Sequence, residues 1–270
     1  MAGSLTPPPE PCSVTLVSNP RGNYRFLPGG EPFSSGAVAD TGYEILHVTL
    51  SRLLPYRAGF QLIEEHLHDM DRPWQALCAV ELRSPRPFSR AGFTEFNRDY
   101  RQLLEECDLL VQGQNPVART NVAPALYAPS EPSLYGFSFT SPQGMEISPE
   151  FVVSGAAELR GGPMETAQVV RPGETSPEAM REKAAYVMDV MARRLDALGV
   201  GWEQVTTIDL YTVAAIEAAL GPVILDAAGP AALHGIRWFH ARPPIDELEF
   251  EMDVRGVGGE TALPIGAGEF

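Results

Sequence analysis

The sequence predicts an α+β protein made of two successive domains, each a mixed sheet covered by two helices on one face. Both halves of the 270 residues carry the same order of elements, which is strand, helix, strand, helix and then two more strands. The helices are indicated by apolar residues at three-and-four spacing, and the strands by β-branched and aromatic residues. An internal duplication explains this repeated order most simply.

The first half contains the less regular copy of the order. We expect strands over 43–50, 74–82, 119–126 and 134–141 and helices over 59–70 and 93–107. The second of these helices has one continuous apolar face, formed by Phe93, Phe96, Tyr100, Leu103, Leu104 and Cys107. Such a face predicts packing against a sheet.

The second half contains the clearest element of the chain, a helix over 177–198. Ser176 can cap its start, Pro177 suits its first position, and Gly199 suits the residue just past its end. Around it we expect strands over 150–159, 205–213, 236–242 and 247–254 and a weaker helix over 214–227.

The boundary between the halves is predicted in the loop over 141–150, where proline and glycine interrupt the apolar pattern. The two domains then comprise residues 14–146 and 147–258. The flanking stretches 1–13 and 259–270 are rich in proline and in glycine, respectively, and we expect flexible termini.

The charge balance disfavours two classes of partner. The chain has 20 lysines and arginines against 35 acidic residues, a formal net charge of -15, so its surface should repel nucleic acid and anionic lipid. Apolar runs stay well short of the roughly 20 residues of a membrane-spanning helix, and no secretory leader is recognised at the start. A small anionic ligand would therefore need a local cation to hold it.

The cysteines and histidines show no metal or disulfide pattern. The three cysteines are widely separated and odd in number, which favours a reducing cytoplasm over a disulfide framework. The HLHD segment places its two histidines on different sides of a helix, and the remaining histidines lack a metal-binding motif. We therefore expect no metal site.

Four segments carry local motifs of a known family. These are FTEFNRDY and NPVARTNV in the first half, and FVVSGAAEL and AAYVMDVMARRLDALGVGWEQVTTIDLYT in the second. Together they resemble the RidA family, also called YjgF or UK114, of enamine and imine deaminases. The resemblance implies a RidA-like (chorismate-mutase-like) fold in each half, a homo-oligomer with a trimer favoured, and no cofactor. It also implies hydrolysis of a carboxylate-bearing enamine or imine with release of ammonia.

The resemblance places the carboxylate-binding arginine of the family at Arg119, its helix asparagine at Asn97 and its strand serine at Ser154. A guanidinium presents paired donors in the plane of a carboxylate, which suits Arg119 to this task. Thr120 and Asn121 follow directly and can bond the same ligand. The alternatives are that Arg119 pairs with an acidic side chain and that Asn97 and Ser154 bond neighbouring backbone.

Neither half contains a complete set of the family residues. The water-positioning glutamate falls at Tyr135 in the first half and at Glu249 in the second, and His234 lies near the second arginine position. Glu249 and Glu251 share one face of a strand, where they are either solvated or, in a cleft, general acid–base groups. Tyr135 either packs or replaces the glutamate as a proton donor. We expect a composite cleft joining Arg119 to groups of the other domain, or an altered chemistry.

The sequence thus predicts a cofactor-independent deaminase that hydrolyses a carboxylate-bearing enamine or imine. A 2-aminomuconate-type dicarboxylate is the preferred substrate, and this preference comes from the resemblance alone. One alternative is a carboxylate-binding protein without catalysis, because Arg119 and Glu249 lie in different halves. Another is a chorismatase-like hydrolase, because chorismatases also use paired domains of this kind.

Overall fold

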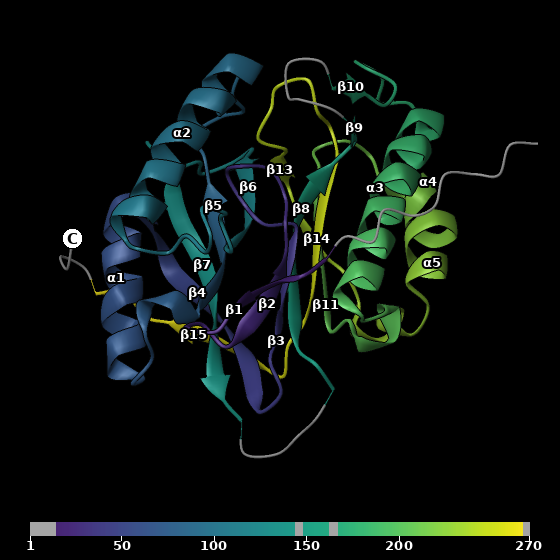
Figure 1. The fold of residues 1–270 in the computed structure, drawn as a ribbon. Helices are drawn as coiled ribbons and strands as arrows, with labels where there is room; N and C mark the ends of the chain where they lie inside the picture. The colour runs from purple at the N-terminus through teal and green to yellow at the C-terminus, as the bar shows by residue number, and fades with distance from the viewer. Residues whose placement is uncertain (1–14, 144–147, 162–166, 267–270) are drawn as a thin grey trace, which may run out of the picture.

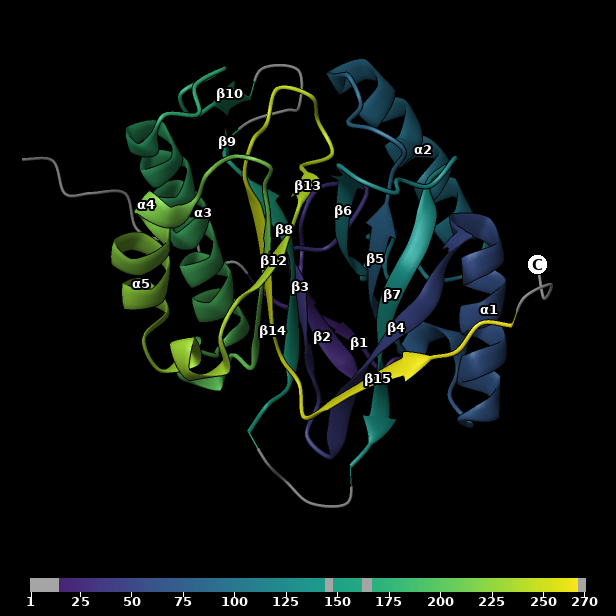
Figure 2. The same ribbon diagram turned by 180° about the vertical axis from the view of Figure 1, so that it is seen from behind.

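Two β-sheets stack face to face in this protein, and helices cover the outer side of each (Figure 1). The computed structural model describes residues 15–143, 148–161 and 167–266. Helices of the first half lie on one flank and helices of the second half on the other, as the view from behind also shows (Figure 2). The layers therefore follow the order helices, sheet, sheet, helices.

The six-stranded sheet is covered by α1 (Tyr56–Asp69) and α2 (Arg90–Glu106). In order across the sheet its strands are β13 (Ala241–Arg242), β6 (Ala118–Pro124), β5 (Leu77–Arg83), β7 (Ser133–Pro142), β4 (Tyr43–Pro55) and β15 (Gly259–Leu263). Apolar side chains of both helices, among them Ile63 and Tyr100, are buried against this sheet. The parallel pair β5 and β6 lies near one edge, which leaves only β13 beyond β6.

The seven-stranded sheet contains, in order, β1 (Val17–Asn19), β2 (Tyr24–Leu27), β3 (Gly36–Ala39), β8 (Phe151–Ala157), β14 (Glu251–Gly256), β11 (Thr207–Tyr211) and β12 (Arg237–Phe239). Its outer face is covered by α3 (Pro177–Leu198) and by a broken helical stretch with α4 (Glu217–Ala219), a π-helical turn (Leu220–Leu225), α5 (Asp226–Ala228) and a 3-10 turn (Gly229–His234). The remaining short elements are β9 (Leu159–Arg160), β10 (Gln168–Val169) and two 3-10 turns (Trp74–Ala76 and Trp202–Gln204).

Helix α3 confirms the prediction made for it at both ends. Ser176 accepts a hydrogen bond from the backbone N–H of Ala179 at 3.3 Å, and Pro177 occupies the first helical turn. Gly199 ends the helix with a φ of 77°, a left-handed conformation that costs glycine little. The apolar stripe of the helix is buried on the seven-stranded sheet. Within the described parts of the chain, α3 and the other helices are too short or too polar to cross a membrane.

The predicted pair of tandem RidA-like (chorismate-mutase-like) domains is wrong, although the α+β class holds. The protein has two large mixed sheets of seven and six strands, and each sheet takes strands from both halves of the chain. Strands β1, β2 and β3 extend the sheet of the second half through the pairing of β3 with β8. In exchange, β13 and β15 join the sheet of the first half.

The physical reason for this difference is that strand pairing between distant segments leaves no local periodicity. Strand β15, in the glycine-rich stretch expected to be a flexible tail, runs parallel to β4 and pairs Thr261 with Val48. The proline-rich stretch 1–13 and part of the predicted boundary loop, 144–147, lie outside the described residues.

A buried layer of charged side chains lies between the two sheets. Arg255 Nη1 donates to Asp209 at 2.9 Å and to Glu81 at 3.4 Å, and Asp253 lies on the same strand as Arg255. Burial raises the pKa of Asp209 to about 7, and burial together with Arg255 lowers the pKa of His47 to about 3. The sheets are thus joined by paired charges as well as by apolar contacts.

Candidate active site

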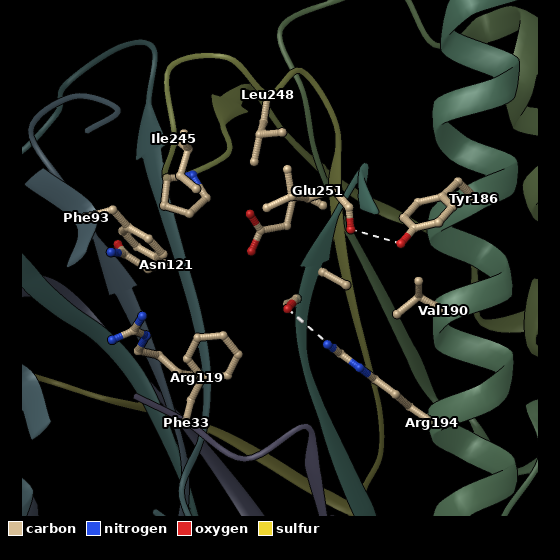
Figure 3. Close-up of a pocket in the computed structure, with 15 residues that line it drawn as sticks. Phe33, Phe93, Arg119, Asn121, Tyr186, Val190, Arg194, Ile245, Leu248 and Glu251 are labelled. Carbon is tan, nitrogen blue, oxygen red and sulfur yellow. Dashed lines mark hydrogen bonds between the residues drawn. The ribbon is translucent and has the colours of Figure 1, made fainter. Parts of the chain in front are cut away.

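A cavity of about 260 Å³ opens between the two sheets beside β6 (Figure 3). Strand β6 contributes one wall, β8 and β14 contribute another, and α3 closes the side. Four polar or charged side chains line it: Arg119, Asn121, Arg194 and Glu251. Most of the other lining side chains are apolar, such as Phe33, Phe93, Val190, Ile245 and Leu248. The cavity therefore holds a few polar groups in a largely apolar wall, as ligand sites commonly do.

Arg119 projects from β6 into the cavity and is buried. Its Nη2 donates to Oδ1 of Asn97 at 2.6 Å, whereas its buried Nη1 has no hydrogen-bond partner among the described residues. The guanidinium also lies 4.9 Å from the ring centre of Phe33 and 4.7 Å from that of Tyr100. Burial lowers the pKa of Arg119 to about 10, so the group stays charged at neutral pH. Leaving a charged donor without a partner is costly, and an anionic ligand that bonds Nη1 would offset that cost.

The backbone of Arg119 is held by Ser154 of the neighbouring sheet. The N–H of Arg119 donates to Ser154 Oγ at 3.0 Å, and this hydroxyl donates in turn to the carbonyl of Ser34 at 2.5 Å. The contact joins β6 to β8 across the gap between the two sheets. Ser154 therefore fixes the place from which the arginine side chain starts.

Asn121 lies two residues further along β6 and faces the same cavity. Its Oδ1 accepts a hydrogen bond from Ser84 Oγ at 2.9 Å, which orients the amide. Its Nδ2 is buried and lacks a hydrogen-bond partner within the described chain. Two unpaired donors, Nη1 of Arg119 and Nδ2 of Asn121, are thus presented by one face of one strand.

Glu251 is the first residue of β14, and its side chain enters the cavity with only 4 % of the residue exposed. Burial, with a smaller contribution from Glu158, raises the pKa of Glu251 to about 8. Arg119 and Arg194 oppose this rise. The group is therefore mostly protonated at neutral pH and can both donate and accept a proton near that pH.

The Glu251 carboxyl group rests against Gly155 of β8. A Cβ atom at position 155 would lie 2.2 Å from Oε1 of Glu251, so only a glycine leaves room for this side chain orientation. The neighbouring sequence forms a bulge, because the register of β14 against β8 shifts between Met252 and Val254. The bulge and the glycine together bring the carboxyl group into the cavity.

Arg194 reaches the cavity from α3, on the same helix face as Tyr186 and Val190. Its Nη1 donates to the carbonyl of Ser154 at 2.7 Å and to that of Gly155 at 3.4 Å. Burial lowers the pKa of Arg194 to about 10. It is the second charged guanidinium of the cavity.

Five of the residues selected from the sequence lie in or beside the cavity. Arg119 and Asn121 line it, while Asn97 and Ser154 contact Arg119. Thr120 points to the layer between the sheets, where its hydroxyl donates to Asp253 at 2.7 Å and accepts from the N–H of Gly155 at 3.1 Å. Thr120 thus supports the bulge on which the Glu251 carboxyl group rests.

The other three selected residues lie outside the cavity lining. Glu249 precedes β14 and accepts a hydrogen bond from Arg242 at 3.0 Å. The ring of Tyr135 packs under the guanidinium of Arg83, at 3.9 Å from its centre. His234 is exposed at the end of a 3-10 turn. The structure therefore does not bring these three side chains together with Arg119.

The sequence does not single out Gly155 or Arg194, and it indicates Glu251 only together with Glu249, as two carboxylates on one strand face that are either solvated or, in a cleft, acid–base groups. For Arg194 a signal exists, because Tyr186, Val190 and Arg194 are spaced four apart on a helix face next to the apolar stripe. For Glu251 the signal is the alternation of side chains along a strand, which places it on the same face as Glu249. The choice between it and Glu249 depends on where β14 begins, which is a tertiary feature.

In the described part of the chain, one cluster of acidic side chains has its oxygen atoms close enough together to hold a cation. Oxygen atoms of Glu81, Asp209 and Asp253 all lie within 4.8 Å of one another between the sheets. Oxygen atoms of all three side chains already accept hydrogen bonds from protein donors, because Arg255 bonds Glu81 and Asp209, and Thr120 donates to Asp253. This arrangement fits a layer of salt bridges better than a cation site, because a bound cation would repel the positively charged Arg255.

A charged guanidinium, an amide donor without a partner among the described residues and a protonatable carboxyl group lie around one cavity, a set of groups that can bind a small carboxylate beside an acid–base group. The protein thus has a cavity with the features of a small-molecule site at which acid–base chemistry is possible. The family model for 2-aminomuconate deaminase CnbZ matches residues 16–261, and the chain belongs to this family.

A curated relative agrees with this membership. A 2-amino-5-chloromuconate deaminase of Comamonas testosteroni is 40 % identical over 245 residues, which are 90 % of this chain and 96 % of the relative. Among solved structures, a chorismatase has a TM-score of 0.43 at 14 % identity, covering 86 % of this chain and 80 % of that one. A cyanuric acid hydrolase has a TM-score of 0.35 at 10 % identity, covering 82 % and 69 %.

Proposed function

We propose that this protein is a deaminase that hydrolyses a 2-aminomuconate-type dicarboxylate and releases ammonia without a cofactor. The observation that carries the proposal is the cavity lined both by Arg119, whose Nη1 has no partner among the described residues, and by the protonatable Glu251. Membership in the 2-aminomuconate deaminase CnbZ family and the deaminase named above support the same substrate class.

Substrate binding uses the two unpaired donors of β6. In 2-aminomuconate the amino group is on C2, next to the C1 carboxylate. The side chains of Arg119 and Asn121 line the cavity from one strand face, and their Nη1 and Nδ2 atoms, which lack partners among the described residues, bond this carboxylate. Asn97 holds the guanidinium in place, so the side chain loses little conformational entropy when the ligand binds.

Proton transfer is the task of Glu251. The protonated carboxyl group donates its proton to C3 of the substrate, which converts the C2 enamine to an iminium. The resulting carboxylate then removes a proton from a water molecule as the water oxygen bonds to C2. The same group returns that proton to nitrogen. As the C2–N bond breaks and ammonia leaves, the C2 hydroxyl gives its proton to the Glu251 carboxylate, which yields the 2-oxo acid and restores the protonated carboxyl group. One water is consumed for each ammonia released, and no electron is gained or lost.

The test is ammonia release from 2-aminomuconate by the purified full chain. Glu251→Gln should lower kcat by about 10²- to 10⁴-fold, since the acid–base group is lost, and Arg119→Met should lower kcat/KM. Because the reactive form is protonated, the rate of the unmodified protein should fall as pH rises through about 8. Glu182→Gln and Arg193→Met are matched controls, since both residues are exposed on α3.

Two results would contradict the proposal. The unmodified chain releasing no ammonia would remove the deaminase activity itself. A full loss of rate in Glu249→Gln with normal turnover by Glu251→Gln would move the proton transfer to Glu249, outside the cavity.

A further inference from the structure

We infer that Arg194 binds the second carboxylate of the substrate, so that the cavity selects dicarboxylates through two guanidinium groups on opposite walls. This inference rests on the proposed function, because it concerns the same cavity. It assigns the C1 carboxylate to Arg119 on β6 and the C6 carboxylate to Arg194 on α3. The substrate chain then runs past Glu251.

The first argument is position. Arg119 and Arg194 enter the cavity from opposite sides, and the Glu251 carboxyl group lies between them (Figure 3). Both guanidinium groups act electrostatically on Glu251, so both lie within range of the same reacting centre. An extended diacid has its charges at its two ends and its conjugated carbons in between. This is the order of groups that the cavity offers.

The second argument is the state of the Arg194 donors. Nη1 is engaged with the carbonyl groups of Ser154 and Gly155. Nε and Nη2 have neither a hydrogen bond nor an ion pair with any of the described residues, and no acidic side chain is bonded to Arg194 there. The backbone contacts hold the side chain at the bulge and leave its other edge available to a carboxylate.

Arg193, the next residue on α3, shows what an ordinary surface arginine of this helix does. It is 61 % exposed and forms an ion pair with Asp189 one turn earlier. Arg194 instead turns inward, where burial lowers its pKa to about 10 although no acid neutralises it directly. Arg194 is partly buried, and even partial burial of a cation that no acid neutralises is costly, so a dianionic ligand would offset that cost.

The third argument is the wall beside Arg194. Val190 and Tyr186 lie one and two turns before it on the same helix face (Figure 3), and Ala157 of β8 lines the same cavity. A substituent on C5, next to the C6 carboxylate, would contact this mostly apolar wall. The wall is therefore suited to hydrogen or to a small apolar substituent at C5 and unsuited to a charged one.

The experiment compares two stable ligands that differ at one end. The dicarboxylate trans,trans-muconate and the monocarboxylate sorbate share the same conjugated chain, but sorbate has a methyl group in place of the second carboxylate. Affinities for both are measured by calorimetry or by competition with the full chain. We expect about 10- to 100-fold tighter binding of muconate by the unmodified protein, the range for one charge-assisted contact.

The variants locate the effect. Arg194→Met should remove this preference and leave sorbate binding within about twofold, which also serves as a test that the variant is folded. Arg194→Lys should retain part of the preference, since it keeps the charge and loses the paired donors. Arg119→Met should weaken both ligands, whereas Arg193→Met should leave both affinities unchanged.

An unchanged muconate preference in Arg194→Met would overturn the inference, as would its absence from the unmodified protein. If Arg194→Met fails to fold, Arg194→Lys decides: an undiminished preference or none at all overturns the inference, and a partial one supports it. These measurements need no turnover. A protein that binds as expected but releases no ammonia would contradict the proposed function alone, and a deaminase without the preference would contradict the inference alone.

Discussion

Replacing Glu251 by glutamine is expected to stabilise the protein at alkaline pH while it removes activity. In the unfolded chain the carboxyl group loses its proton near 4.5, and in the folded protein burial raises its pKa to about 8. Between these values the folded state binds more protons, so the free energy of unfolding falls as pH rises and levels off above about 8. Glutamine has nearly the same shape and does not titrate.

The size of the effect follows from the pKa. A rise from 4.5 to about 8 corresponds to about 4 to 5 kcal/mol at about 1.4 kcal/mol for each pH unit. This value is a ceiling, because water drawn to the ionised carboxylate would lower it, and we expect about 2 to 4 kcal/mol. The gain of Glu251→Gln over the unmodified protein should thus be near zero at pH 5 and reach this range at pH 9.

The assay is urea unfolding followed by circular dichroism, with both proteins at pH 5, 7 and 9. Subtracting the unfolding free energy of one protein from that of the other cancels the contribution of the remaining titrating groups. The reasoning is refuted if the difference in unfolding free energy is the same at pH 5 and pH 9, or if the glutamine variant is the less stable protein at pH 9.

Three further changes test other contacts. Arg119→Lys should lower kcat/KM for ammonia release about 10- to 100-fold, because lysine cannot present paired planar donors, and steady-state kinetics would show a smaller loss if only charge matters. Gly155→Ala should displace the Glu251 carboxyl group and lower kcat while the urea midpoint changes little, since its Cβ would lie 2.2 Å from Oε1; normal kcat would contradict this. Lys183→Met should cost about 3 to 5 kcal/mol in urea unfolding because it leaves buried Glu158 unpaired, and adding Glu158→Gln should recover part of the loss.

Elements with a strong local pattern could be predicted from the sequence. Helix α3 has its first-turn proline, and its cap and terminal glycine are the residues directly before and after it, so its ends agree with the prediction at Pro177 and Leu198. Arg119 was selected because of a motif around it, and it lies in the cavity. In these cases the information is contained in neighbouring residues.

The remaining features depend on contacts between distant segments. Strands β3 and β8 pair Val38 with Phe151, and no periodicity in either segment encodes that pairing. Glu251 enters the cavity because β14 begins at that residue and Gly155 leaves room for it. Its acid–base character arises from burial between two sheets, so the strand pattern alone could not separate it from a solvated glutamate.

The exchange of strands between the sheets determines how the two halves of the chain would behave as separate fragments. A fragment ending at residue 143 would lack β13 and β15, and a fragment starting at 148 would lack β1, β2 and β3. Each fragment would expose a bare strand edge, which promotes aggregation. Produced together, the two pieces can supply each other's missing strands, so co-expression should yield soluble material where either fragment alone precipitates.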